Sequence, residues 1–178
     1  MRGNFVKDET SIRPMDDRDA HRLPGLGPRG EGYVVLQSLA IAAVAISGDL
    51  GPHWPDPVRT PLRIVGVALG AAGLTLVIGG RVALGRSFTP FPRPRHSSST
   101  LVEAGPYRLV RHPLYGGVTL LGLAWCLVSS PVALVAELLL VTVHEAKRRR
   151  EEAWLLERYA GYAAYRGRVR RALIPWVY

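Results

Sequence analysis

The sequence predicts an all-α, polytopic integral membrane protein with about four transmembrane helices. Hydrophobic residues make up 48% of the 178 residues, but they gather in four blocks instead of being spread along the chain. Lys and Arg lie between and beyond these blocks, where membrane topology signals are found. The length is enough for one domain. The combination indicates a small membrane protein and not a soluble core.

The first two apolar blocks predict two N-terminal membrane helices. One runs over about residues 33–47, which is short against the roughly 20 residues that a bilayer span needs. The other runs over about residues 60–80, where Thr60 can cap the helix and Pro61 suits the first helical position. Small residues on the second helix, which let helices approach closely in lipid, are Gly66, Gly70 and Gly73.

The last two blocks predict a C-terminal helical hairpin. The third helix begins at Pro113 and ends near Val128, and residues 129–131 form a tight turn. The fourth runs over about residues 132–144 and continues beyond the membrane as a cytoplasmic amphipathic helix through Tyr165. We therefore divide the chain into a disordered cytoplasmic tail (1–31), two N-terminal membrane helices (32–80) and a catalytic region with the hairpin (81–178).

The distribution of positive charge predicts the topology. The N-terminal tail carries six Lys or Arg residues, the first loop and the start of the second helix two, the central segment six, the short turn none and the C-terminal tail nine. Four spans with both termini in the cytoplasm place every basic segment inside, as the positive-inside rule requires. We therefore expect both termini to lie on the cytoplasmic side of the membrane.

Composition also disfavours several classes of function. The net charge of +9 has a membrane explanation, so we expect no nucleic-acid partner. Cys126 is the single cysteine, which excludes a disulfide within the chain and disfavours a cysteine metal site. Glu137 lies in mid-membrane, where a carboxylate must face protein or water. We expect it to bond a neighbouring helix.

Polar residues gather at both feet of the hairpin. Because the turn is tight, the two helices are antiparallel neighbours and their feet share one membrane depth. The foot of the third helix carries Tyr107 and residues 111–115. The foot of the fourth carries His144, Lys147, Arg148, Glu151 and Glu152. A helix start attracts carboxylates, and aromatic faces attract cations. These groups together suit a zwitterionic, cationic cofactor.

These motifs resemble a known family. The order is Ser99-Thr100-Leu101-Val102, then GPYRLVRHPLY, then the hairpin, then Glu151-Glu152-x-x-Leu155 and Tyr162-x-x-Tyr165. It is similar to the isoprenylcysteine carboxyl methyltransferase family, whose superfamily includes bacterial homologues and phospholipid N-methyltransferases. The resemblance covers roughly residues 81–171, and LGRSFTPFPRPR resembles the bacterial branch. By that resemblance, the location that we expect is the inner (plasma) membrane of a bacterium.

The resemblance implies an integral membrane methyltransferase that uses S-adenosylmethionine. We expect no metal site. By that resemblance, the cofactor pocket comprises Ser99, Thr100, Leu101, Val102, Tyr107, His112, Pro113, Leu114, Tyr115 and Glu151. Lys147 best matches a basic residue that contacts the substrate in the family, and Arg148 is next. Ser99 replaces a His that is frequent in eukaryotic relatives.

The reaction type leaves the acceptor open. A carboxylate acceptor needs no general base, so no catalytic residue is obligatory, whereas an amine would need deprotonation, for which His112, His144 or Glu151 could serve. The acceptor is a lipid-like or prenylated molecule bearing a carboxylate, thiol or amine. Two alternatives are an NADPH-dependent membrane reductase related to sterol reductases and a non-enzymatic membrane adaptor. The sequence does not define an oligomeric state.

Overall fold

The computed structural model describes residues 26–93 and 100–175, and within these ranges it contains helices and no strands. Most of the predicted tail (1–31) and Ser99 lie outside the described residues. The elements in chain order are α2 (Glu31–Leu50), α3 (Asp56–Leu84), the 3-10 turns η1 (Gly85–Ser87) and η2 (Gly105–Arg108), α4 (Pro113–Val128), α5 (Ala133–Arg158) and α6 (Tyr162–Arg168).

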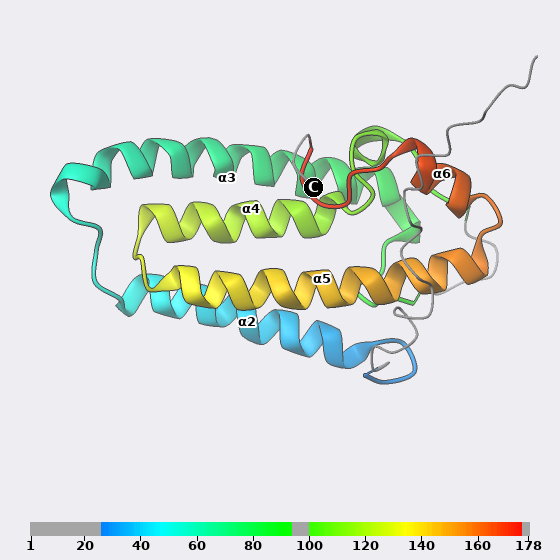
Figure 1. The fold of residues 1–178 in the computed structure, drawn as a ribbon, viewed down its shortest axis with the longest axis horizontal. Helices are drawn as coiled ribbons and strands as arrows, with labels where there is room; N and C mark the ends of the chain where they lie inside the picture. The colour runs from blue at the N-terminus through cyan, green and yellow to red at the C-terminus, as the bar shows by residue number, and fades with distance from the viewer. Residues whose placement is uncertain (1–25, 94–99, 176–178) are drawn as a thin grey trace, which may run out of the picture.

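The four long helices lie side by side in the order α3, α4, α5, α2 (Figure 1). The hairpin of α4 and α5 forms the centre, with α3 packed on α4 and α2 packed on α5. Both α2 and the stretch Asp56–Ser87 are long and apolar enough to cross a membrane, and α4 is apolar but shorter. Large apolar side chains remain exposed on α2, α3 and the first half of α5. The protein is thus an all-α membrane protein, as predicted.

The glycines of α3 allow close packing against α4. A Cβ atom on Gly73 would lie 2.7 Å from the carbonyl oxygen of Gly117, and one on Gly66 would lie 3.0 Å from that of Ala124. Small residues permit such close approach between helices in lipid. The glycine face predicted on this helix therefore packs within the chain.

The start of α3 differs from the sequence prediction. The helix begins at Asp56, so Pro57 and not Pro61 occupies its first turn, and Thr60 is not its cap. Pro61 lies inside the helix, where it removes one backbone hydrogen bond. Asp56 favours the earlier start, because its carboxylate lies in the first turn and pairs with Arg59 at 2.9 Å. The first span is also longer than predicted, at 20 residues.

The extension of α5 is shorter than predicted. The helix ends at Arg158 instead of continuing through Tyr165, because Tyr159 adopts an extended conformation. The short helix α6 then begins at Tyr162 and folds back beside the end of α5 (Figure 1). The break brings Tyr162 and Tyr165 inward, and both are buried.

Candidate functional site

A cavity of about 550 Å³ lies at the end of the four-helix arrangement where α4 begins, beside the second half of α5. Residues of α2, α3, α4, α5 and α6 line it. The segment after α3 covers it with Ser87, Phe88, Thr89, Pro90 and Pro92, and α6 closes its other end with Tyr162 and Tyr165. Apolar helix surfaces and polar side chains therefore share one partly open cavity.

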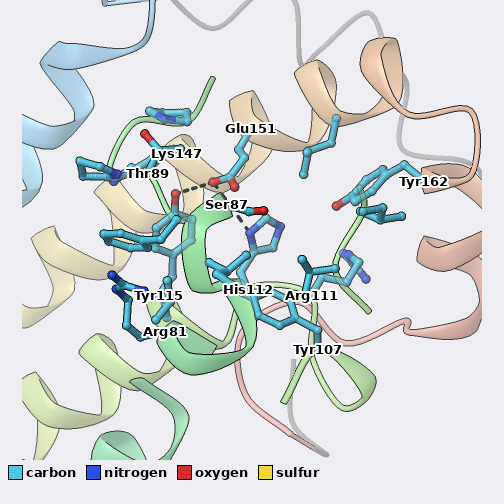
Figure 2. Close-up of a pocket in the computed structure, with 18 of the residues that line it drawn as sticks. Arg81, Ser87, Thr89, Tyr107, Arg111, His112, Tyr115, Lys147, Glu151 and Tyr162 are labelled. Carbon is cyan, nitrogen blue, oxygen red and sulfur yellow. Dashed lines mark hydrogen bonds and ion pairs between the residues drawn. The ribbon is translucent and has the colours of Figure 1, made fainter. Parts of the chain in front are cut away.

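Glu151 and Tyr115 form the centre of the cavity (Figure 2). The hydroxyl group of Tyr115 donates a hydrogen bond to Oε2 of Glu151. The Tyr115 ring stacks against two imidazoles, with ring centroids 5.5 Å from that of His112 and 5.4 Å from that of His144. This stack fixes the phenol, and the phenol in turn orients the carboxylate. Glu151 keeps 24% of its side chain exposed, so a ligand can reach it.

A second carboxylate, Glu152, lies fully buried behind the cavity. Its Oε1 accepts hydrogen bonds from Nε of Arg111 at 2.8 Å and from Nε2 of His112 at 3.0 Å. Arg148 pairs with the same oxygen at 3.1 Å. Glu152 therefore holds the loop before α4 against α5, and it sets the orientation of the His112 ring.

The charge state of Glu152 follows from these partners. Burial by itself raises the pKa of its carboxyl group, but the His112 hydrogen bond and the charges of His112, Arg111 and Arg148 outweigh burial and hold this pKa well below its usual range. Glu152 is therefore an anion in the folded protein. For Tyr107, burial raises the pKa, and the nearby Glu151 charge adds to this, so the phenol stays neutral.

The C-terminal segment fixes the other side of the loop. The backbone N–H of Arg111 donates to the carbonyl of Arg171 at 3.0 Å, and that of His112 donates to Ala172 at 2.8 Å. The Arg111 guanidinium also donates to the carbonyls of Val169 and Arg170. The segment after α6 thus holds Arg111 and His112 in place, although it is distant from them in sequence.

The opposite end of the cavity is basic. Nζ of Lys147 donates to Oε1 of Gln37 on α2 at 2.7 Å and lies 5.0 Å from the centroid of the Tyr115 ring. Arg81 and Arg86 line the same cavity, and Figure 2 shows Arg81 and Lys147 on the side away from Tyr162. Val34, Val77 and Val118 add apolar surface from three helices.

Most of the residues predicted for the site line this cavity. They are Thr100, Leu101, Val102, Tyr107, His112, Leu114, Tyr115, Lys147 and Glu151. Pro113 is buried at the start of α4, where it shapes the helix without lining the cavity. Arg148 does not line it either, since its guanidinium pairs with Glu145 at 2.6 Å as well as with Glu152. Ser99 lies outside the described residues.

Several lining residues were not among the predicted site residues, although Arg111, Tyr162 and Tyr165 appeared in the sequence motifs. They are Gln37, Arg81, Arg86, Ser87, Phe88, Thr89, Arg111, Tyr159, Tyr162 and Tyr165. Sequence reasoning named Glu152 at the foot of the fourth helix and in the Glu-Glu pair, but gave it no role. The helical spacing of Glu152 from Arg148 was the available signal for their pairing. Glu137 is buried and faces Gly122 of α4, but neither of its oxygens has a hydrogen-bond partner among the residues described, contrary to the expected bond.

Comparison with known proteins identifies relatives of the chain. A family model described as phospholipid methyltransferase matches residues 62–161. The cobalt-zinc-cadmium resistance protein CzcN of Cupriavidus metallidurans is 31% identical over 117 residues, which cover 63% of this chain and 47% of that protein. The chain thus spans about half the length of this curated relative.

The family match spans more than half of the chain and includes both feet of the hairpin. It confirms the resemblance at the level of the superfamily and favours methyl transfer over the reductase and adaptor alternatives. The cavity lies largely within the matched region, since its central residues Tyr107, His112, Tyr115 and Glu151 all fall inside residues 62–161. The chain belongs to the phospholipid methyltransferase family.

Proposed function

We propose that this protein is an enzyme that transfers a methyl group from S-adenosylmethionine to a hydrophobic acceptor held in the membrane. The observation that carries the proposal is the single cavity in which Glu151 and several tyrosines meet apolar side chains of the membrane helices. A water-soluble cofactor and a lipid-like acceptor can meet in such a space. When bound, S-adenosylmethionine supplies an electrophilic methyl group on a sulfonium.

The residues of the cavity fit this cofactor. Pockets of about 300–1,000 Å³ accommodate ligands of this size, and this cavity measures about 550 Å³. Glu151 offers a reachable negative charge beside the Tyr115 ring, and carboxylates and aromatic faces both attract cations. We assign cofactor binding to the predicted residues that line the cavity: Thr100, Leu101, Val102, Tyr107, His112, Leu114, Tyr115 and Glu151.

The basic end of the cavity suits the acceptor. Lys147 there is ordered by Gln37 and lies among apolar side chains, so an acceptor with an apolar chain and a polar head can place the head beside it. Arg148 is engaged by two carboxylates, which favours Lys147 of the two predicted substrate contacts. A prenylated acceptor of the isoprenylcysteine type is one member of this class.

The protein's own contribution is positioning and exclusion of water. The segment after α3 covers the cavity, and the helices around it limit access by water. For a carboxylate acceptor this is sufficient, because a carboxylate is already nucleophilic. For an amine acceptor, Glu151 is the candidate base, since His112 donates to Glu152 and His144 is fully buried and does not line the cavity.

We place the cavity at the cytoplasmic face of a bacterial plasma membrane, with both termini inside, because the basic segments gather there. The name of the CzcN relative refers to metal resistance. Because its match covers 47% of that protein, the proposal follows the family match instead.

The test is transfer of labelled methyl groups to lipid. Membranes containing the protein are incubated with methyl-labelled S-adenosylmethionine, and the lipids are extracted and separated. We expect label in an apolar product, and loss of that label with Glu151→Ala or His112→Ala. The control is Asp49→Asn. Asp49 is exposed and lies at the end of α2 away from the cavity, so this variant should retain transfer. The proposal would be overturned if membranes containing the protein gave no more labelled product than membranes lacking it.

A further inference from the structure

Tyr162 carries a polar group that the fold leaves unsatisfied. Its side chain is 1% exposed and lines the cavity, yet its hydroxyl oxygen has no hydrogen-bond partner in the described part of the chain. Figure 2 shows this hydroxyl directed toward the interior of the cavity. A buried hydroxyl without a hydrogen-bond partner costs free energy. A ligand that supplied an acceptor for this hydroxyl would therefore bind more tightly.

The surroundings of Tyr162 define the kind of ligand. Aromatic side chains of Tyr107 and Tyr165 line this end of the cavity. Arg111 also lies near it (Figure 2), with its guanidinium engaged by Glu152 and two backbone carbonyls. This end lies on the side of Glu151 and His112 away from Lys147 and Arg81 (Figure 2). Cationic groups of a ligand therefore belong beside Glu151, and an uncharged aromatic group belongs here.

Tyr165 provides an internal contrast. It lies on the same helix, one turn later, and its hydroxyl donates to the backbone carbonyl of Tyr107 at 2.8 Å. The two rings lie 5.8 Å apart between centroids. One hydroxyl thus has a structural partner, whereas its neighbour has a donor available to a ligand.

We propose that the tyrosine-lined end of the cavity is a purine subsite and that the Tyr162 hydroxyl donates a hydrogen bond to a ring nitrogen of the bound purine. A purine offers flat faces to the tyrosine rings and ring nitrogens as acceptors. The assignment rests on the proposed function, since S-adenosylmethionine carries its purine at the end opposite to its charged amino-acid group. It makes Tyr162 a cofactor-binding residue.

The first measurement is thermal unfolding of the purified protein without ligand. Tyr162→Phe removes only an unpaired hydroxyl, so the midpoint should stay unchanged or rise. Tyr165→Phe removes a satisfied hydroxyl and should lower the midpoint. A clear fall for Tyr162→Phe would show a structural role for this hydroxyl and overturn the inference.

The second measurement is calorimetric binding of S-adenosylhomocysteine and of its 1-deaza, 3-deaza and 7-deaza analogues. Tyr162→Phe should weaken S-adenosylhomocysteine binding about tenfold, as loss of one buried hydrogen bond implies. One of the three analogues lacks the nitrogen that accepts this hydrogen bond. The unsubstituted protein should bind that analogue as weakly as Tyr162→Phe binds S-adenosylhomocysteine. Tyr162→Phe should not weaken binding of that analogue any further. Tyr165→Phe should change affinity much less.

The outcomes separate this inference from the proposed function. If the unsubstituted protein binds S-adenosylhomocysteine and Tyr162→Phe binds it equally well, the purine subsite is wrong and the proposed function stands. Equal losses on Tyr162→Phe for all three analogues would also contradict the purine contact. If the unsubstituted protein binds neither S-adenosylhomocysteine nor S-adenosylmethionine, both proposals fall.

Discussion

Arg111 and Glu152 form a buried ion pair, with Nε of Arg111 2.8 Å from Oε1 of Glu152 and side chains 7% and 1% exposed. The pair joins the loop before α4 to the end of α5. The same Arg111 guanidinium holds the C-terminal segment through two backbone carbonyls. Three stretches of chain that are distant in sequence therefore meet at one carboxylate behind the cavity.

Replacing Glu152 should strongly destabilise the protein. Removing one partner of a buried ion pair leaves the other charge uncompensated, and Glu152→Gln should therefore cost about 3–5 kcal/mol of unfolding free energy. The matched control is Asp56→Asn, which breaks a pair with Arg59 in which the aspartate is 86% exposed, and it should cost no more than about 1 kcal/mol. Denaturant unfolding in detergent measures both. Equal small losses would contradict the role assigned to Glu152.

The same carboxylate should make the fold sensitive to acid. Its pKa in the folded protein lies below the value of about 4.5 expected for the unfolded chain. A depressed pKa contributes stability that is fully present above about pH 4.5 and is lost as the pH falls toward the folded pKa. The unfolding free energy should therefore decrease below about pH 4.5. The decrease should be smaller in Glu152→Gln, and an identical decrease in both proteins would refute this origin.

Gly116 should tolerate no side chain. A Cβ atom there would collide with the carbonyl oxygen of Leu173, in the segment that fixes His112. Gly116→Ala should therefore cost about 1–3 kcal/mol and lower ligand affinity. Gly167→Ala is the control, because a Cβ atom there meets nothing within 4 Å, and it should be neutral or slightly stabilising within α6. Thermal unfolding with and without S-adenosylmethionine compares them.

Tyr115 should contribute to binding more than to stability. Tyr115→Phe keeps the ring stacked against His112 and His144 but removes the hydroxyl that orients Glu151. Loss of this orienting contact should weaken S-adenosylmethionine binding about tenfold or more. The unfolding midpoint should fall less than in Glu152→Gln, because Glu151 keeps 24% of its side chain exposed and water can replace the lost donor. Unchanged affinity in a folded Tyr115→Phe protein would argue against this orienting contact.

The sequence was sufficient for the helical hairpin and for the residues of its two feet. Apolar blocks and Pro113 predict α4 well, because its start depends on local chemistry. The start of α3 was predicted wrongly because Pro57 and Pro61 are both acceptable near a helix start, and the Asp56 contact decides between them. Local sequence patterns do not distinguish a helix start near Pro57 from one near Pro61.

Other features depend on contacts between distant segments. Helical spacing places Arg148 and Glu151 on one face of the helix. It cannot show that Arg148 forms ion pairs with Glu145 and Glu152. The pairing of α2 with α5, which brings Gln37 to Lys147, is equally invisible in the sequence. The inward position of Tyr162 required the break at Tyr159, where the pattern favoured a continuous helix.

Binding of S-adenosylmethionine to the purified protein and to Glu151→Gln tests the central claim most directly. Calorimetry should detect binding to the unsubstituted protein and to Asp49→Asn. Affinity should be at least about tenfold lower for Glu151→Gln, since loss of a charge beside a bound cation costs more than about 1.4 kcal/mol. Unfolding midpoints should confirm that the variant is folded. Equal affinity in both proteins, or binding of NADPH without binding of S-adenosylmethionine, would contradict the account.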